Sequence, residues 1–113
     1  MPARLDIPLT ATHLTAAQVE RLRRLLVAEY TDRKARAVEL QDPIDLEPDL
    51  ADVLLASTYE AMDEIEAALK RIEDGTYATC VSCGAPIPFE RLEIVPPADR
   101  CVACQADRDR TLR

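Results

Sequence analysis

The sequence predicts a mainly helical protein: an antiparallel helical hairpin of the coiled-coil type, with an acidic tip and a C-terminal four-cysteine zinc finger. Three observations support this prediction. Two stretches with helical spacing of apolar residues flank a proline-containing segment, acids gather around that segment, and two Cys-x-x-Cys pairs follow. The chain has 113 residues, which suits one domain, or one domain with an extended arm.

The composition favours packed helices over a large globular core. Hydrophobic residues make up 48% of the chain, but only 4% are aromatic. Small side chains bury little apolar area each, so closely packed helices with a metal site fit this composition better.

The first expected helix follows a flexible N-terminal arm, residues 1–14, which contains prolines and has no periodic pattern. Thr15 is a suitable N-cap, and neither glycine nor proline interrupts the chain from there to about Leu40. The helical repeat places a set of apolar residues near one face: Val19, Leu22, Leu26, Ala37 and Leu40.

The tip is expected at residues 41–48, because each proline there disfavours helical angles in the residue before it. Pro48 suits the first turn of a second helix, from about Asp49 to Asp74, and Gly75 ends that helix. The hairpin thus occupies residues 15–75. The apolar face of the second helix is predicted to contain these residues: Leu54, Ala61, Ile65, Ala68 and Ile72.

Charge is distributed unevenly along the hairpin, and the net charge of the chain is −7. No Lys or Arg occurs from Ala37 through Leu69, whereas acids are frequent: Glu39, Asp42, Asp45, Glu47, Asp49, Asp52, Glu60, Asp63, Glu64 and Glu66. Pairing with bases of the first helix is one explanation for the acids from Glu60 onwards. It does not account for the acids of the loop.

The two cysteine pairs predict a metal site in residues 76–113, a segment that also contains a short C-terminal helix. Cys80 and Cys83 are separated from Cys101 and Cys104 by 17 residues between the pairs, a spacing typical of four-cysteine zinc sites. Gly84 supplies the backbone freedom that such a turn needs. Four sulfur ligands leave no open position for a water, so one structural zinc ion is expected. The hairpin seam does not pass through this site and is expected to survive in part without it.

Two alternatives for the cysteines remain open. Four thiolates could hold iron and carry electrons, or the pairs could form disulfides in an oxidising compartment. The start of the chain lacks the apolar segment of a secretory signal, and no apolar run is long enough to span a bilayer. A cytoplasmic protein is therefore expected, and there metal ligation is the commoner use of paired cysteines.

Several function classes fit poorly. An acidic chain is a poor candidate for binding DNA, and the finger carries only two bases between its outer cysteines, Arg91 and Arg100. No catalytic motif is present, and His13, the one histidine, falls in the expected arm. The protein is therefore not expected to be an enzyme.

These features together resemble the DksA/TraR family of bacterial RNA polymerase-binding transcription factors. The finger carries the resemblance in Cys-x-x-Cys-Gly, Arg91-Leu92, Ala98-Asp99 and Cys-x-x-Cys-Gln, and the preceding helix, residues 65–77, also fits. At the tip, Asp42-Pro43-Ile44-Asp45 is similar to the family's pair of acids. The resemblance covers most of residues 15–105.

The resemblance implies a transcription regulator that binds RNA polymerase directly, without a membrane and as a monomer. In that family the hairpin enters the secondary channel of the polymerase, and the tip acids approach the catalytic centre. Carried over by motif, Asp42 and Asp45 are those acids. Glu47 stands where the family has an alanine, which bears on the function of the tip.

The resemblance also implies a difference. The family binds guanosine tetraphosphate through basic residues of the second helix and finger, and the matching positions here are Ser57, Glu64, Val95 and Gln105. None is basic, so the response to this alarmone is expected to be absent. The alternative function is a coiled-coil adaptor, stabilised by zinc, that binds another protein. This alternative would be favoured if the tip acids proved dispensable.

Overall fold

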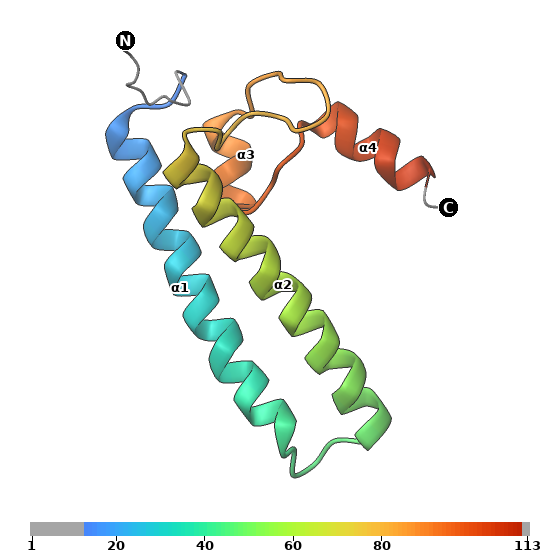
Figure 1. Cartoon of the computed structure of the whole chain (residues 1–113). Helices are drawn as coiled ribbons and strands as arrows, with labels where there is room; N and C mark the ends of the chain where they lie inside the picture. The colour runs from blue at the N-terminus through green and yellow to red at the C-terminus, as the bar shows by residue number, and fades with distance from the viewer. Residues whose placement is uncertain (1–12, 112–113) are drawn as a thin grey trace.

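A computed structural model describes residues 13–111 and shows a helical hairpin with a small finger at its base. Its helices are α1 (Ala16–Gln41), α2 (Pro48–Asp74), α3 (Phe89–Ile94) and α4 (Val102–Thr111). The long helices α1 and α2 lie side by side and run in opposite directions (Figure 1). The finger covers the end of the pair opposite the tip, and α4 projects away from it. The predicted fold class is confirmed.

The start of α1 is fixed by the predicted cap. The Thr15 hydroxyl accepts a hydrogen bond from the backbone N–H of Gln18 at 3.0 Å, and the Gln18 side chain accepts one from the Thr15 N–H at 2.9 Å. This reciprocal pair satisfies two N–H groups that the first turn of a helix leaves free. One turn later Glu20 binds Arg23 and Arg24, and their hydrogen bonds lower the pKa of Glu20 to about 2.

The ends of α2 follow the expected backbone chemistry. Pro48 is its first residue, where the missing N–H costs no helical hydrogen bond. Gly75 follows its last residue with a φ of 79°, in the left-handed region that glycine enters without strain. Both long helices thus begin and end within one residue of their expected positions.

The seam between the long helices agrees with the prediction on α1 and differs from it on α2. On α1 the buried residues are Leu22, Leu26, Ala37 and Leu40, all expected. On α2 they are Ala51, Thr58, Met62, Ile65 and Ala68, of which only the last two were expected. Several neighbouring rows of α2 are apolar, so its helical repeat alone does not select one. Thr58 is tolerated in the seam because its hydroxyl donates to the Leu54 carbonyl at 2.7 Å.

The main core joins the hairpin to the finger. Leu22 and Leu26 of α1 and Ile65 of α2 belong to one buried cluster with Tyr77 and Leu92 of the finger. The Tyr77 hydroxyl donates a hydrogen bond to the Pro96 carbonyl at 2.8 Å, which satisfies this buried polar group. The near end of the hairpin seam therefore packs against the finger. The survival of part of the hairpin without the metal site stays a prediction.

His13 and Leu14 are docked and do not form part of a loose arm. The Nε2 of His13 donates to the Ile87 carbonyl of the finger at 2.7 Å, and Leu14 packs against the main core. The rest of the expected arm, residues 1–12, lies outside the described residues.

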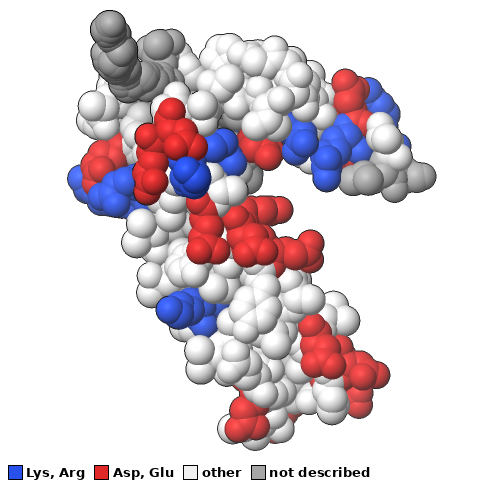
Figure 2. Space-filling model, viewed as in Figure 1, with Lys and Arg blue, Asp and Glu red and all other residues white. Residues whose placement is uncertain are grey.

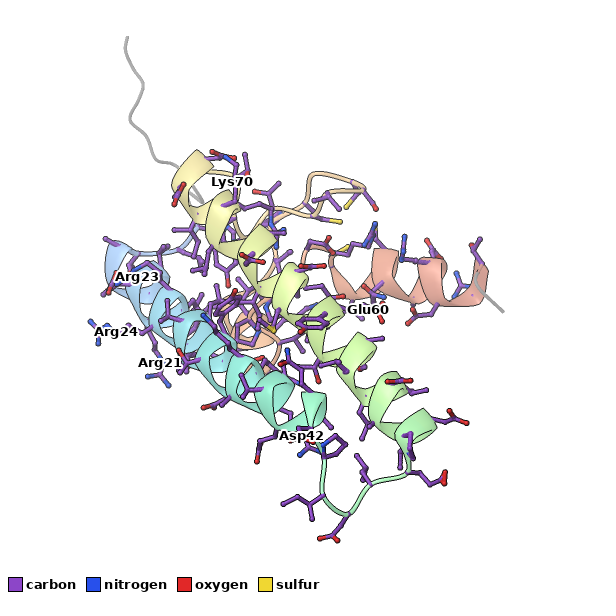
Figure 3. All side chains as sticks on the ribbon, turned by 60° about the horizontal axis from the view of Figure 1, so that its bottom comes forward. Arg21, Arg23, Arg24, Asp42, Glu60 and Lys70 are labelled. Carbon is purple, nitrogen blue, oxygen red and sulfur yellow. The ribbon has the colours of Figure 1, made fainter. Side chains whose placement is uncertain are left out.

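The proposed cross-helix charge pairing is absent within residues 13–111, where no ion pair joins α1 to α2. Arg23 and Arg24 bind Glu20 of the same helix, and Arg21 binds Glu93 of α3. These three arginines lie on the side of α1 that faces away from α2 (Figure 3). Among the described residues Asp74 is the only acid of α2 in an ion pair, with Lys70 of the same helix. Red patches continue down towards the tip (Figure 2). None of the described helices is long and apolar enough to cross a membrane.

Candidate metal centre and hairpin tip

The first cysteine pair lies in a tight turn after α2. The Gly84 N–H donates to the Cys80 carbonyl at 2.9 Å, and the Cys80 N–H donates to the Ala85 carbonyl at 2.8 Å. Gly84 has a φ of 78°, which the turn requires and a residue with a side chain rarely adopts. This turn holds Cys80 in a buried position and leaves Cys83 exposed.

The second pair lies at the start of α4. Cys104 belongs to the first turn of that helix, and the Gln105 N–H donates to the Cys101 carbonyl at 2.9 Å. A further backbone hydrogen bond, from Val81 to the Asp99 carbonyl at 2.8 Å, ties the two cysteine pairs together. Both pairs are therefore placed by backbone hydrogen bonds as well as by the cysteines themselves.

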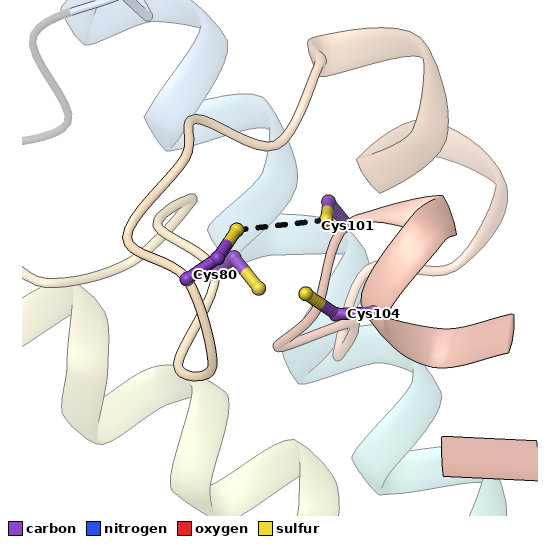
Figure 4. A group of neighbouring side chains, drawn as sticks. Cys80, Cys101 and Cys104 are labelled. Atoms are coloured by element: carbon purple, nitrogen blue, oxygen red, sulfur yellow. Dashed lines mark hydrogen bonds between the residues drawn. The ribbon is translucent and has the colours of Figure 1, made fainter. Parts of the chain in front are cut away.

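The four sulfurs converge on one point (Figure 4). All of them lie within 4.8 Å of one another, and the Cys83 and Cys101 sulfurs are 3.8 Å apart. A tetrahedron with Zn–S bonds of about 2.3 Å has edges of about 3.8 Å, so the spacing fits a zinc ion. Among residues 13–111 no other cluster of cysteine, histidine and acidic side chains has ligand spacing.

The acidity of the thiols also suits a cation at this point. Backbone hydrogen bonds, the strongest from Cys101, lower the pKa of Cys80 to about 6. The neighbouring sulfurs of Cys101, Cys83 and Cys80 instead raise the pKa of Cys104 to about 12. Four thiolates so close together repel one another, and a divalent ion removes that repulsion.

The tip places Asp42 and Asp45 in the loop between α1 and α2, and both are exposed. Asp42 directly follows α1 (Figure 3), and its N–H donates to the Glu39 carbonyl at 3.4 Å. The loop and the end of α1 enclose a shallow hollow of about 420 Å³. Its lining includes Arg36, Glu39 and both tip aspartates.

A second hollow, of about 580 Å³, lies between α2, the finger and α4. It contains three of the four positions matched to the family's alarmone site, namely Glu64, Val95 and Gln105, whereas Ser57 is not part of it. The hollow is also lined by four bases that were not among the positions matched to the family's alarmone site: Arg71, Arg91, Arg100 and Arg108. Arg71 was accessible to sequence reasoning, since it follows Glu64 by seven residues and so shares its helix face.

Three of these arginines are engaged by the protein itself. Arg71 donates to the Pro97 carbonyl at 3.4 Å, and Arg91 donates to the Arg100 carbonyl at 3.2 Å. Arg100 pairs with Asp99 at 3.1 Å. The hollow is thus mixed in charge, with Glu64 and Asp99 beside its bases.

Comparison with known proteins identifies the finger and the whole fold. A family model of the prokaryotic dksA/traR C4-type zinc finger matches residues 75–110. The RNA polymerase-binding transcription factor DksA of Escherichia coli (strain K12) is 28% identical over 109 residues, covering 82% of this chain and 72% of that protein. The solved structure of transcription factor DksA2 from Pseudomonas aeruginosa matches with a TM-score of 0.69 and 28% identity, covering 93% of each chain.

Residues 75–110 form a four-cysteine zinc finger of the dksA/traR type. The chain as a whole is similar to DksA proteins. General stress protein 16O of Bacillus subtilis (strain 168), another relative, is 48% identical over 48 residues, but the match covers only 42% of this chain and 29% of that protein. The structure of Dks from Chlamydia trachomatis shares the fold, with a TM-score of 0.56 at 22% identity.

Proposed function

We propose that this protein binds RNA polymerase directly and regulates the initiation of transcription, with its hairpin tip inserted in the secondary channel. The observation that carries the proposal is a slender acidic arm held by a four-cysteine finger, in a chain similar to DksA along most of its length. DksA of Escherichia coli is named for its binding to RNA polymerase.

The shape of the arm suits a narrow channel. At 1.5 Å per residue, the 26 residues of α1 extend about 39 Å. Its free end carries Asp42 and Asp45, and the hollow there is lined by one base, Arg36. Carboxylates delivered to a catalytic centre alter the groups and metal ions that bind nucleotides there, so the tip can regulate without performing chemistry itself.

The zinc ion has a structural role in this proposal. Cys80, Cys83, Cys101 and Cys104 hold one ion, and four protein sulfurs leave no site for a reactive water. Among the described residues, the hollow at the tip contains acids and one arginine but neither histidine nor cysteine. The protein therefore acts by binding and is not an enzyme.

Independence from guanosine tetraphosphate is the finer part of the proposal. A highly charged anion needs several free cations, and the four matched positions supply none. Three arginines of the same hollow are engaged by the protein, because Arg71 and Arg91 donate to carbonyl groups and Arg100 pairs with Asp99. Glu64 adds a negative charge to the lining.

A pull-down with RNA polymerase core enzyme separates this function from the adaptor alternative. The purified protein is expected to retain core enzyme, and a finger-deficient variant such as Cys101→Ser to retain less. Failure of the intact, zinc-loaded protein to bind core enzyme contradicts the proposal and favours an adaptor for another protein. Direct binding to DNA is not expected, since the two bases between the outer cysteines of the finger, Arg91 and Arg100, both contact protein groups.

A further inference from the structure

Ile44 is unusually exposed for its chemistry. It lies between the two tip aspartates with 94% of its surface accessible, more than any other large hydrophobic residue in residues 13–111. Single exposed apolar residues are common on protein surfaces and need no explanation by themselves. Ile44, however, is accompanied by other exposed apolar residues near the tip.

The far end of the hairpin concentrates exposed apolar side chains. Val38 on α1 and Leu50 and Val53 on α2 are also exposed, and all lie within 15 residues of one another around the loop. They belong to both helices that flank the tip. Pro43 and Leu46, on either side of Ile44 in the loop, are only half-buried. The end of the arm is thus both apolar and acidic.

We propose that Ile44 anchors the tip by entering an apolar pocket of RNA polymerase whose rim is positively charged. This inference rests on the proposed function and adds to it the residue that supplies affinity at the tip. Apolar groups around the arm favour a partner that encloses it over a flat surface. The charge of the rim follows from the groups around Ile44, because the hollow that it lines contains three acids, Glu39, Asp42 and Asp45, and one base, Arg36.

In this arrangement the isoleucine and the aspartates of the tip have different roles. Burial of an isoleucine removes apolar surface from water and so contributes affinity. Exposed carboxylates contribute little affinity, because the cost of removing their water offsets much of the attraction to a cation. Ile44 therefore holds the tip in place, and the aspartates act on the catalytic centre.

The test compares Ile44→Ser with Ile94→Ser. Ile94 is the matched control, because it is the same residue type, is 81% exposed and ends α3, in the finger rather than the tip. Both variants should fold like the parent, which circular dichroism and zinc content check. Ile44→Ser is expected to raise the Kd for core enzyme by about ten- to a hundredfold, the range for burial of one isoleucine. Ile94→Ser should leave the Kd within about threefold.

A second measurement separates anchoring from regulation. At saturating concentration Ile44→Ser should regulate transcription to the same maximum as the parent. Equal affinity of the parent and Ile44→Ser overturns the anchor while leaving the proposed function intact, as does equal weakening by both serine variants. If the parent itself does not bind core enzyme, the proposed function fails and the anchor with it.

Discussion

Asp42 and Asp45 have no structural partner that explains their charge. Neither forms an ion pair with any residue from 13 to 111, and both are exposed in the loop. An exposed carboxylate without a partner contributes little to stability, so its removal reports on function rather than folding.

Asp42→Asn combined with Asp45→Asn is expected to abolish the effect on transcription and to leave polymerase binding within about tenfold, or about 1.4 kcal/mol. The free energy of unfolding should change by no more than about 0.5 kcal/mol, because exposed loop charges seldom matter more. Abortive transcription from a ribosomal-type promoter, paired with a binding titration, measures both effects. Full regulation by the double variant would show that the tip is inert and would favour the adaptor.

Guanosine tetraphosphate is expected to change the effect of the parent on transcription by less than about twofold, or about 0.4 kcal/mol. The reason is the scarcity of free cations around Glu64, Val95 and Gln105. The measurement uses a polymerase whose other alarmone site is disabled. The decisive control is Arg108→Ala, since an alarmone-dependent gain that this variant removes places a working site in the hollow.

Among individual residues, the sequence predicted those whose role follows from a rule about their spacing along the chain. The four cysteines and Gly84 follow such a rule, and the structure brings the cysteines together with Gly84 in the left-handed region. Ala78, with a φ of 69°, follows no such rule and was missed. The arginines of the large hollow were missed because it is assembled from α2, the finger and α4, which no local pattern relates.

The long helices are defined by their ends. Thr15, Pro48 and Gly75 each suit the backbone geometry or hydrogen bonding of a helix end. The sequence therefore predicted these helix ends to within one residue. The seam of α2 was harder to predict, because an alanine-rich helix has several rows that pack equally well. Only the contact with α1 selects Ala51, Thr58 and Met62.

Thr15→Ala is expected to lower the free energy of unfolding by about 1 kcal/mol, because the backbone N–H of Gln18 in the first turn of α1 loses its acceptor, the Thr15 hydroxyl. Thermal or urea unfolding followed by circular dichroism measures the loss. Thr31→Ala is the matched control, since Thr31 is exposed within α1 and its hydroxyl donates only to the Val27 carbonyl at 3.0 Å. It should cost less than about 0.5 kcal/mol. Equal losses in the two variants would show that the cap has no special role.

The hairpin is packed against the finger at the end opposite its tip. The main core gathers Leu22, Leu26 and Ile65 of the hairpin with Tyr77 and Leu92 of the finger. Towards the tip the buried seam residues are Leu40 and two small residues, Ala37 and Ala51. Sequence reasoning treated hairpin and finger as separate units, because the contacts that unite them are distant in the chain.

Cys101→Ser is expected to weaken zinc binding and to loosen the finger together with the near end of the hairpin. Elemental analysis should find about one zinc per parent chain and less in the variant. Hydrogen exchange should rise at Leu22 and Leu26, which lose their packing, and change less at Leu40 near the tip. Val81→Ala, an exposed change inside the first cysteine pair, should leave both measurements as in the parent. Iron in place of zinc, or faster exchange confined to residues 76–111, contradicts this account.

Cross-linking from the tip tests the central claim most directly. A photoreactive residue at position 45 of the zinc-loaded protein is expected to label the polymerase segments that line the catalytic centre. The same residue at position 74, at the opposite end of α2, should label only segments at the outer mouth of the channel. Labelling of the catalytic centre from position 45 alone supports insertion of the hairpin tip first. Labelling of only the outer surface from position 45, or of no polymerase subunit at all, contradicts it.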